Sequence, residues 1–477
     1  MVQVCMVVDN DVRRDPRVQK EARSLVARGY RVAVIGRTYQ RDDTAWEDFP
    51  GGFRVRRVFV VDRQKELERV SLETRQSIKT ALHRLAPRVY GPTMKLYRRA
   101  RGIPERPSSP PPAPEVSSPP QPPEPPRPPT IEEIHSWYMG SLDTHDRIQQ
   151  QLAEAIALTR PEVVHAHDLD VLESGAWAAR ATGAALVYDA HEIWWQQHAE
   201  GQVPKGWIDF HRDLEHRLIK EADRVITVCD SIARFLAEAH SVPTPVVVRN
   251  AIEVPPGGFF SPDRIHPTGA PIEVLFHGGF GLHRGLEELI ASVETWRGAR
   301  LILRGFGDTQ AELVRLIDES GLTERVVFEA PVPMSEVVTA ASRSDVGVIP
   351  YKPVCLNNRF STPNKLFEYL SGGLAIAASD LPEIRRVVDS ERVGALFDPD
   401  DPKSISEAVN RLAADRDELH RMRQRAVECT RDRLSWAQES KALLAVYAEL
   451  FPRPLGAKVL KLSRSAASLV WAKVRAS

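Results

Sequence analysis

The segment 360–380, FSTPNKLFEYLSGGLAIAASD, combines a helix start with a carboxylate more than one turn further on. Thr362 is a good N-cap residue and Pro363 suits the first helical position, so we expect a short helix over 364–370. The free N–H groups at such a start carry about half a positive charge and bind phosphate well. Glu368 is placed to accept hydrogen bonds from vicinal hydroxyls, such as those of a ribose. The segment therefore predicts a nucleotide-diphosphate site.

The residues after this helix indicate its end and the start of a strand. Gly372 and Gly373 can take the left-handed conformation that ends a helix, and the apolar run 374–378 is typical of a buried parallel strand. A proline-started helix before a buried strand is also ordinary α/β structure, in which Glu368 would be a solvated carboxylate. Other segments must decide between these two interpretations.

Two glycine-rich turns favour the phosphate interpretation. The first, GGFGLHRG at 278–285, follows an apolar run and contains Arg284, a charge-assisted donor for phosphate. The second, RGFGD at 304–308, follows the next apolar run. Either turn alone is explained by tight turning, but together with the helix start they predict a donor site. The contacts expected from the two turns are those of Gly279, Gly281, Arg304 and Gly305.

Histidines and carboxylates follow two strand-like runs in the first half of the chain. The first run ends in HAHD at 165–168, and the next ends in YDAHE at 188–192. We interpret His165 as a buried histidine bonded to the backbone, and His167 and His191 as cleft-facing groups for a hydroxylated substrate. A metal site would use the same side chains, but their spacing defines no closed ligand set, so no metal is expected.

Composition restricts the class of protein and its compartment. The 477 residues contain 64 Lys plus Arg and 64 Asp plus Glu, which gives no electrostatic case for a nucleic-acid partner. The four cysteines have no metal-ligand spacing and fit a reducing cytoplasm. The first residues lack the basic region and long apolar run of a signal peptide, and no apolar stretch reaches roughly 18 residues. We expect a cytoplasmic protein.

Short apolar runs alternate with helical patterns twice along the chain. The expected strands are 2–8, 31–36, 161–165, 185–188, 224–228 and 245–248 in the first half, and 273–276, 300–303, 325–328, 346–349 and 374–378 in the second. The expected helices include 15–28, 285–296, 402–429 and 436–450. This alternation predicts an α/β protein with two Rossmann-like, doubly wound parallel-sheet domains that face a central ligand cleft.

The domain boundaries follow from changes in composition. We expect an N-terminal Rossmann-like acceptor domain at 1–254, a linker at 255–271, and a C-terminal Rossmann-like donor domain at 272–432. A helix within 433–453 is expected to pack back on the N-terminal domain, and 454–477 forms a basic amphipathic tail. Fourteen of the 28 residues 102–129 are proline, so 102–130 is interpreted as a disordered insertion, with a ligand for a proline-binding module as the alternative.

With these residues in view, the chain resembles family 4 of the retaining glycosyltransferases, which have the GT-B fold of two Rossmann-like domains. The resemblance runs from the first strand to about residue 453, apart from the proline-rich insertion. The family's pair of glutamates, eight positions apart, places Glu368 at the second position and implies a role on the donor ribose. Phe360 occupies the first position, where the family residue contacts the donor sugar.

The resemblance also implies which residues hold the donor diphosphate. Asn364 and Lys365 lie at the helix start that binds diphosphate in the family. Of the family's Arg and Lys pair, Arg284 takes the Lys position and Gly279 the Arg position, so one cation is missing. Arg304 or Lys365 is expected to compensate.

Three first-domain residues resemble cleft residues of the family. The D-x-R-V of one branch fits residues 15–18 and makes Arg17 a cleft candidate. His167 matches the cleft-facing histidine of the H-x-H element, and His191 resembles the histidine after the following strand. The cleft candidates are therefore Arg17, His191 and Phe360, while His167, Arg284 and Lys365 are the expected catalytic residues.

The implied chemistry is transfer of a hexose from a nucleotide-diphosphate sugar to a hydroxyl acceptor, with retention of configuration and without metal or other cofactor. The acceptor would be a sugar, a lipid-linked or a small-molecule hydroxyl in polysaccharide or glycoconjugate biosynthesis. Two alternatives remain: a catalytically degenerate GT-B nucleotide-binding protein, motivated by Phe360 and Gly279, and a nucleotide-sugar epimerase. An NAD-dependent oxidoreductase is least favoured because residues 9–15 contain no glycine.

Two basic regions, 84–101 and 458–475, mix Lys and Arg with apolar residues. Such segments can lie on anionic membranes, which would place the protein peripherally at the inner membrane face. A solvated surface helix is the alternative interpretation of both.

Overall fold

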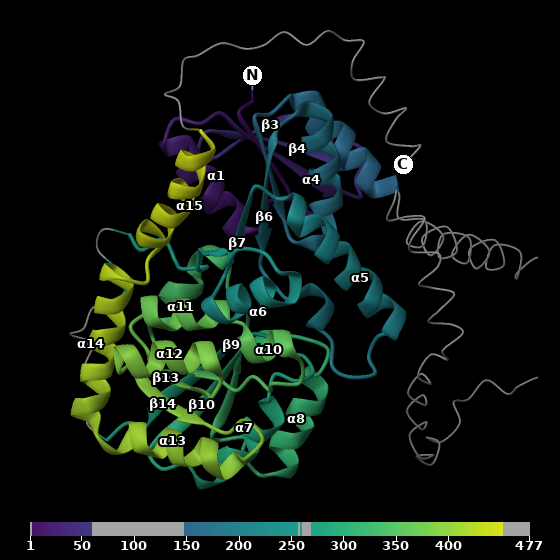
Figure 1. Ribbon diagram of the computed structural model, residues 1–477. Coiled ribbons are helices and arrows are strands. Elements are labelled where there is room, and N and C mark those ends of the chain that lie inside the picture. The colour runs from purple at the N-terminus through teal and green to yellow at the C-terminus, as the bar shows by residue number, and fades with distance from the viewer. Residues whose placement is uncertain (1, 60–146, 256–257, 260–268, 452–477) are drawn as a thin grey trace, which may run out of the picture. The chain divides into compact units, whose positions relative to one another are not determined.

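The computed structural model describes residues 2–59, 147–255, 258–259 and 269–451. The described residues up to 58 and from 148 onward belong to one compact unit, which contains two sheets (Figure 1). The proline-rich segment 102–130 and the basic regions 84–101 and 458–475 lie outside the described residues, so the expectations for them stay predictions.

The first sheet has eight strands in the order β3-β4-β2-β1-β5-β6-β7-β8. Its strands are β1 (Val4–Val7), β2 (Val32–Thr38), β3 (Glu47–Phe49), β4 (Phe53–Phe59), β5 (Val163–His167), β6 (Ala185–Ala190), β7 (Arg224–Thr227) and β8 (Val246–Val247). The pairings from β2 through β8 are parallel, whereas β3 and β4 form an antiparallel edge. The carboxyl ends of the parallel strands therefore share one edge of the sheet.

The second sheet has six parallel strands in the order β11-β10-β9-β12-β13-β14. Its strands are β9 (Ile272–Gly279), β10 (Ala299–Phe306), β11 (Val326–Glu329), β12 (Val346–Ile349), β13 (Ala375–Ser379) and β14 (Gly394–Phe397). The order reverses at β9 and β12, and such a reversal is where ligands bind in open α/β sheets.

Helices connect the strands, as the alternation predicts. They are α1 (Pro16–Ala27), α4 (Leu169–Thr182), α5 (Lys205–Leu218), α6 (Asp230–His240), α7 (Leu286–Ser292), α8 (Gln310–Glu319), α9 (Val337–Ala341), α10 (Leu356–Phe360), α11 (Asn364–Ser371), α12 (Pro382–Glu391), α13 (Pro402–Ala414), α14 (Arg416–Asp432) and α15 (Trp436–Leu450). Residues 147–159 are also helical, and short 3₁₀ turns include η1 (Trp194–Gln196) and η4 (Met334–Glu336). None of the described helices is long and apolar enough to cross a membrane.

Some expected boundaries are wrong for identifiable reasons. The expected helix 402–429 is two helices, because the Asp415 side chain accepts a hydrogen bond from the Glu418 N–H (2.9 Å) and caps a new start. At α11 the N-cap is Pro363 rather than Thr362. The helix expected at 285–296 ends earlier, and 293–295 forms a 3₁₀ turn.

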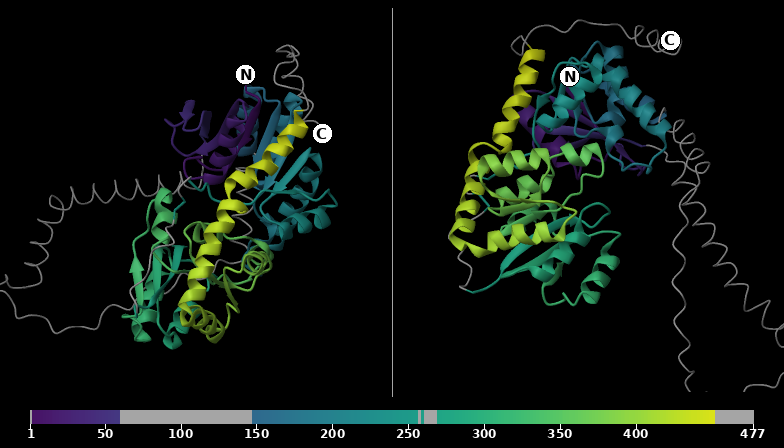
Figure 2. Two further views of the ribbon diagram at one scale, coloured as in Figure 1. Left: turned by 90° about the vertical axis from the view of Figure 1, so that its left-hand side faces the viewer. Right: turned by 60° about the horizontal axis from the view of Figure 1, so that its bottom comes forward.

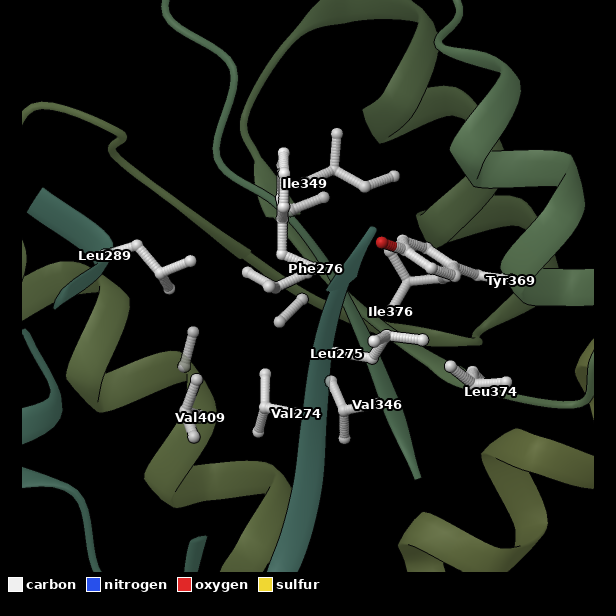
Figure 3. Packing of buried hydrophobic residues seen from close by; sticks show 14 of the residues in the cluster. Val274, Leu275, Phe276, Leu289, Val346, Ile349, Tyr369, Leu374, Ile376 and Val409 are labelled. Carbon is white, nitrogen blue, oxygen red and sulfur yellow. The ribbon is translucent and has the colours of Figure 1, made fainter. Parts of the chain in front are cut away.

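The core of the second sheet surrounds β9, which is buried on both faces. Val274, Leu275 and Phe276 are fully buried in one cluster. Leu289 and Val409 lie on one side of this strand, and Tyr369 and Leu374 lie on the other (Figure 3). Helices therefore cover both faces of the sheet, which explains why its strands are apolar throughout.

The last described helix returns to the first sheet. Trp436, Leu443, Val446 and Tyr447 of α15 share a hydrophobic cluster with residues of β1 and β2. The indole N–H of Trp436 donates to the Ser24 hydroxyl on α1 (2.9 Å). Helices α14 and α15 follow one another past the second sheet and then the first (Figures 1 and 2).

The packing around β13 generates a stability prediction. Ile376 is fully buried, whereas Leu158 is 74% exposed. We expect Ile376→Ala to lower the free energy of unfolding by about 2–5 kcal/mol, because it removes apolar contacts and leaves a cavity. Leu158→Ala, the same size of change on the surface, should change it by less than about 0.5 kcal/mol. Chemical denaturation followed by circular dichroism measures both, and equal effects would contradict the packing described.

Candidate active site

The two glycine-rich turns lie side by side at the carboxyl ends of β9 and β10. Gly278 pairs in register with Gly305, and the N–H of Phe280 donates to the Phe306 carbonyl (2.8 Å). A Cβ on Gly305 would lie 1.9 Å from the Gly278 carbonyl oxygen, so only glycine fits there. The structure thus brings both turns together as backbone-rich surfaces.

The turn at 278–285 also leaves space around two of its glycines. A Cβ on Gly279 or Gly281 would meet no described heavy atom within 4 Å. Neither has the positive φ that would demand glycine. Gly279, at the position where the resemblance expects an arginine, therefore leaves open space. The positive charge of that arginine must come from another residue.

Lys365 lies against this turn. A Cβ on Gly278 would come within 2.8 Å of the Lys365 ammonium nitrogen. That ammonium donates to the Tyr351 hydroxyl (2.8 Å), and the Arg284 guanidinium lies 4.4 Å from the centre of the Tyr351 ring. Tyr351 therefore gathers both expected catalytic cations through one hydroxyl and one aromatic face.

Tyr351 is a site residue that sequence reasoning missed. It follows β12 directly after Pro350, whose carbonyl oxygen would lie 1.9 Å from a Cβ on Gly285. This close contact docks the arginine-bearing turn on the residues after β12. The available signal was an aromatic residue just beyond a wholly apolar run, which also fits ordinary core packing.

Glu368 is fixed by a second missed residue, His277. The Nε2 atom of His277 lies 2.7 Å from Oε2 of Glu368, and the His277 N–H donates to the Tyr369 hydroxyl (3.0 Å). His277 belongs to β9, which extends three residues further than the expected strand and carries this side chain next to the glycine turn. The carboxylate of Glu368 thus lies at the same sheet edge as the two cations, with its side chain 15% exposed.

Arg304 does not share this site. Its guanidinium pairs with Glu329 on the neighbouring strand β11 (Nε–Oε2 2.9 Å), and the residue is buried. Its charge is therefore used within the sheet. Of the two expected substitutes for the missing cation, Lys365 is the one that lies at the glycine turn.

The start of α11 and the last residue of the preceding helix, α10, face different partners. No side chain caps α11 among the described contacts, and the Asn364 side chain accepts from Asn250 Nδ2 (2.9 Å). Phe360 packs against the core cluster of the first sheet, and its carbonyl accepts from the Cys229 thiol (3.1 Å). Phe360 therefore acts as an apolar anchor between the two halves of the chain.

Arg17 is a buried ion-pair partner, which corrects the expectation of a cleft residue. Its guanidinium donates to both carboxylate oxygens of Asp189 (2.8 and 2.9 Å) and to the Val248 carbonyl. It also lies 3.1 Å from the Glu21 carboxylate, and only 3% of it is exposed.

The three histidines surround the same aspartate. His167, expected to face the cleft, is instead fully buried, with Nδ1 3.2 Å from an oxygen of Asp189. His165 bonds to the Tyr447 hydroxyl (2.7 Å) rather than to the backbone. His191, with its side chain 18% exposed, has Nδ1 at 2.8 Å from Asp168 and Nε2 at 2.9 Å from Asp189.

Charge states within this group are set by competition between burial and pairing. Burial disfavours protonation of His191, but Asp168 and Asp189 outweigh it and raise its pKa well above the usual value. Burial lowers the pKa of His165 to about 3. Burial tends to raise the pKa of Asp189, yet Arg17 and His191 hold it well below its usual range. His191 is thus an imidazolium whose two N–H groups are already engaged.

Four buried side chains, Glu21, His165, His167 and Asp189, could spatially surround a metal ion, since one ligand atom from each lies within 4.8 Å of the others. The oxygens of Asp189, however, already accept from Arg17, His167 and His191. The guanidinium of Arg17 supplies positive charge at the same place. We therefore assign these residues to an Arg17–Asp189 charge cluster rather than to a metal centre.

An open cavity of about 630 Å³ is lined by residues that follow β12 and β13 in sequence. Its lining consists of Pro353, Arg359, Asp380, Leu381, Pro382 and Arg385. Arg385 pairs with Asp380 in this lining, and we assign no ligand to the cavity.

Solved structures with the same arrangement of two sheets define the fold class. A sucrose-phosphate synthase from Thermosynechococcus elongatus superposes with a TM-score of 0.66 at 15% identity, covering 95% of this chain and 100% of that chain. The Anabaena protein HepE in complex with UDP superposes with a TM-score of 0.58 at 13% identity, covering 94% and 100%. The fold is GT-B, as the sequence predicts.

Family models identify the chain more closely. A model described as "Glycosyl transferase 4-like domain" matches residues 85–251, and one described as "Glycosyl transferases group 1" matches residues 271–415. The chain belongs to the group 1 family of glycosyltransferases. A D-inositol 3-phosphate glycosyltransferase from Nocardia farcinica is 26% identical in an alignment 316 positions long, which covers 58% of this chain. The match spans 66% of that relative, slightly less than two thirds.

The Arg17–Asp189 charge cluster generates the second prediction. Asp189→Asn removes the negative charge that accepts two hydrogen bonds from the buried Arg17, so we expect the free energy of unfolding to fall by about 3–5 kcal/mol. Asp213, whose side chain is 71% exposed and pairs with the exposed Arg212, provides the control. Asp213→Asn should change stability by less than about 0.5 kcal/mol. Denaturant titration of both variants tests this, and a fully stable Asp189→Asn protein would rule out the cluster's structural role.

Proposed function

We propose that this protein transfers a sugar from a nucleotide-diphosphate sugar to a hydroxyl acceptor. The observation that carries the proposal is the gathering of Arg284 and Lys365 on Tyr351, against the backbone of the glycine turn. Glu368 lies at the same sheet edge, held by His277. Membership of the group 1 glycosyltransferase family supports the assignment.

The chemistry proposed for this site is stabilisation of a leaving diphosphate. When the bond from the sugar to the diphosphate breaks, negative charge grows on the phosphate oxygens. Arg284, Lys365 and the N–H groups of the turn and of the α11 start would stabilise that charge without having to reorganise. Both cations are held by an aromatic side chain, and neither pairs with a carboxylate in the described part of the chain, so their charge stays available to a ligand. Retention of configuration and independence from metal are part of this proposal, and they rest on the resemblance to family 4.

We further infer that the nucleobase lies over apolar side chains at the neighbouring strand ends. Leu282, Phe306 and Met334 are 69%, 66% and 65% exposed. They lie at or beyond the carboxyl ends of β9, β10 and β11, which are adjacent in the sheet. A flat base covering these side chains would remove apolar surface from water and stack on the Phe306 ring.

The relatives suggest which donor to test first. The structure of HepE contains UDP, and a second structure of HepE contains UDP and glucose. We therefore propose a uridine nucleotide and a hexose as the first probes.

The acceptor is proposed to be a sugar, a lipid-linked or a small-molecule hydroxyl. Membrane contact through 84–101 and 458–475 stays a hypothesis, which sedimentation with anionic liposomes can test.

A second candidate function is nucleotide binding without transfer. It is favoured by one observation, the packing of Phe360 against the first-sheet core, because this removes the side chain from the position where the family has a sugar-contacting glutamate. Such a protein would bind a nucleotide but would neither transfer nor hydrolyse the sugar.

Nucleotide binding is tested by thermal shift with UDP, GDP, ADP and dTDP on the wild type and on Glu368→Ala. A ligand at 100 times its Kd stabilises the native state by about 2.7 kcal/mol, so the melting temperature should rise with one nucleotide. The rise should disappear or shrink in Glu368→Ala, because the carboxylate is proposed to hold the ribose. If no nucleotide shifts the wild type, the proposed function fails.

Transfer is tested with Arg284→Ala, using the nucleotide sugar of the base that stabilises the wild type. The variant lacks the preorganised positive charge that stabilises the leaving diphosphate, so turnover should fall by about 10²- to 10³-fold. Arg315→Ala removes an exposed arginine of the same domain and should leave turnover unchanged. Turnover of both variants can be measured without an acceptor, as hydrolysis of the donor detected by the release of nucleoside diphosphate. Near-normal turnover in Arg284→Ala would remove this residue from the mechanism.

A further inference from the structure

The first-sheet half of the chain carries a carboxylate, Glu192, that has few partners. It follows His191 in the loop between β6 and η1 and is half-buried. Its one described hydrogen bond is long, 3.4 Å from Asn357 Nδ2 to Glu192 Oε2. No ion pair with Glu192 occurs among the residues that the structure describes. Since a carboxylate offers about four acceptor sites, most of its hydrogen-bonding capacity remains open.

The position of this carboxylate is fixed by α10. The Ile193 N–H donates to Asn357 Oδ1 (3.0 Å), so one amide side chain contacts both the backbone and the side chain of the Glu192 loop. Leu356 and Phe360, on either side of Asn357 in the same helix, pack against the first-sheet core. The loop therefore meets the second half of the chain at a defined place.

Charges from both halves of the chain act on Glu192. Burial raises its pKa and Asp168 raises it further, while the positive charges of His191 and Arg284 act in the opposite direction. Arg284, the cation proposed to bind the diphosphate, is thus one of the charged groups that act on this carboxylate. His191 cannot donate to it, because both ring nitrogens of His191 already contact aspartates.

These neighbours select the kind of ligand group that fits. A phosphate is attracted by Arg284, but a phosphate placed next to Glu192 would be repelled by its carboxylate. A half-buried carboxylate with unfilled acceptor sites is stabilised instead by hydroxyl donors. The part of a nucleotide sugar that is neutral, rich in hydroxyls and next to the diphosphate is the sugar to be transferred.

We propose that Glu192 binds hydroxyl groups of the transferred sugar and thereby contributes to its selection. This inference rests on the proposed function. The side chain of Phe360 has no polar atom with which to contact the sugar, and Glu192 is proposed to make that contact instead. The glutamate comes from the first-sheet half, so the sugar would contact both halves of the chain at once.

Titration calorimetry with UDP, GDP, ADP and dTDP and with UDP-glucose, GDP-mannose, ADP-glucose and dTDP-glucose tests the inference on Glu192→Gln. For the base that the wild type prefers, the affinity for the nucleotide sugar should fall by about 10- to 100-fold. The affinity for the diphosphate alone should stay within about twofold or increase, because a negative charge has been removed. Equal losses for both ligands, or an unchanged affinity for the sugar nucleotide, would overturn the proposal.

The control is Glu383→Gln, which changes another carboxylate that joins the two halves. Oε1 of Glu383 accepts from the Ser231 N–H (2.7 Å) and is not placed at the donor site. It should not change the ratio of the two affinities, which separates sugar contact from a general loosening of the junction. If Glu192→Gln does not fold, Glu192→Asp retains the charge on a shorter side chain and should lose sugar affinity selectively. A wild type that binds none of the diphosphates would instead refute the proposed function itself, whatever the variants do.

Discussion

The buried ion pair between Arg17 and Asp189 is the interaction on which the first-sheet half depends. It joins α1 to the carboxyl end of β6, and the same guanidinium reaches the carbonyl of Val248 beyond β8. Because Asp189 stays ionised, it also holds His167 and His191 on one of its oxygens. One paired charge thereby fixes the positions of groups from four segments of the chain, at the edge of the sheet where an acceptor is expected.

The second-sheet half handles charge in the opposite way. Arg304 is neutralised by Glu329 inside the sheet, but Arg284 and Lys365 are held by Tyr351, which carries no charge. A carboxylate in place of this tyrosine would hold the cations more tightly and would compete with any phosphate. An aromatic partner positions them and leaves their electrostatic attraction for an anion. The difference between these two arrangements distinguishes charges that support the fold from charges available to a ligand.

Periodicity and helix-ending residues predicted most of the fold, because apolar alternation and Gly or Pro at fixed positions act locally. The runs at 346–349 and 436–450 match β12 and α15 as the structure has them. The site was harder to predict. Which way His167 points, and that Arg304 meets Glu329, depends on neighbouring strands that are distant in sequence. Tyr351 and His277 gave only weak local signals, since an aromatic or a histidine at a strand end usually belongs to the core.

The return of α15 to the first sheet has a consequence for the order in which the chain is made. Tyr447 supplies the hydroxyl that bonds to Nδ1 of the buried His165, and Trp436 and Leu443 complete the cluster around β1. A ribosome releases the N-terminal strands first, yet these partners emerge only after the whole second sheet has been synthesised. Until then the apolar face of β1 lacks part of its cover, and a buried imidazole lacks its partner. The domain that begins the chain is therefore the last to complete its core.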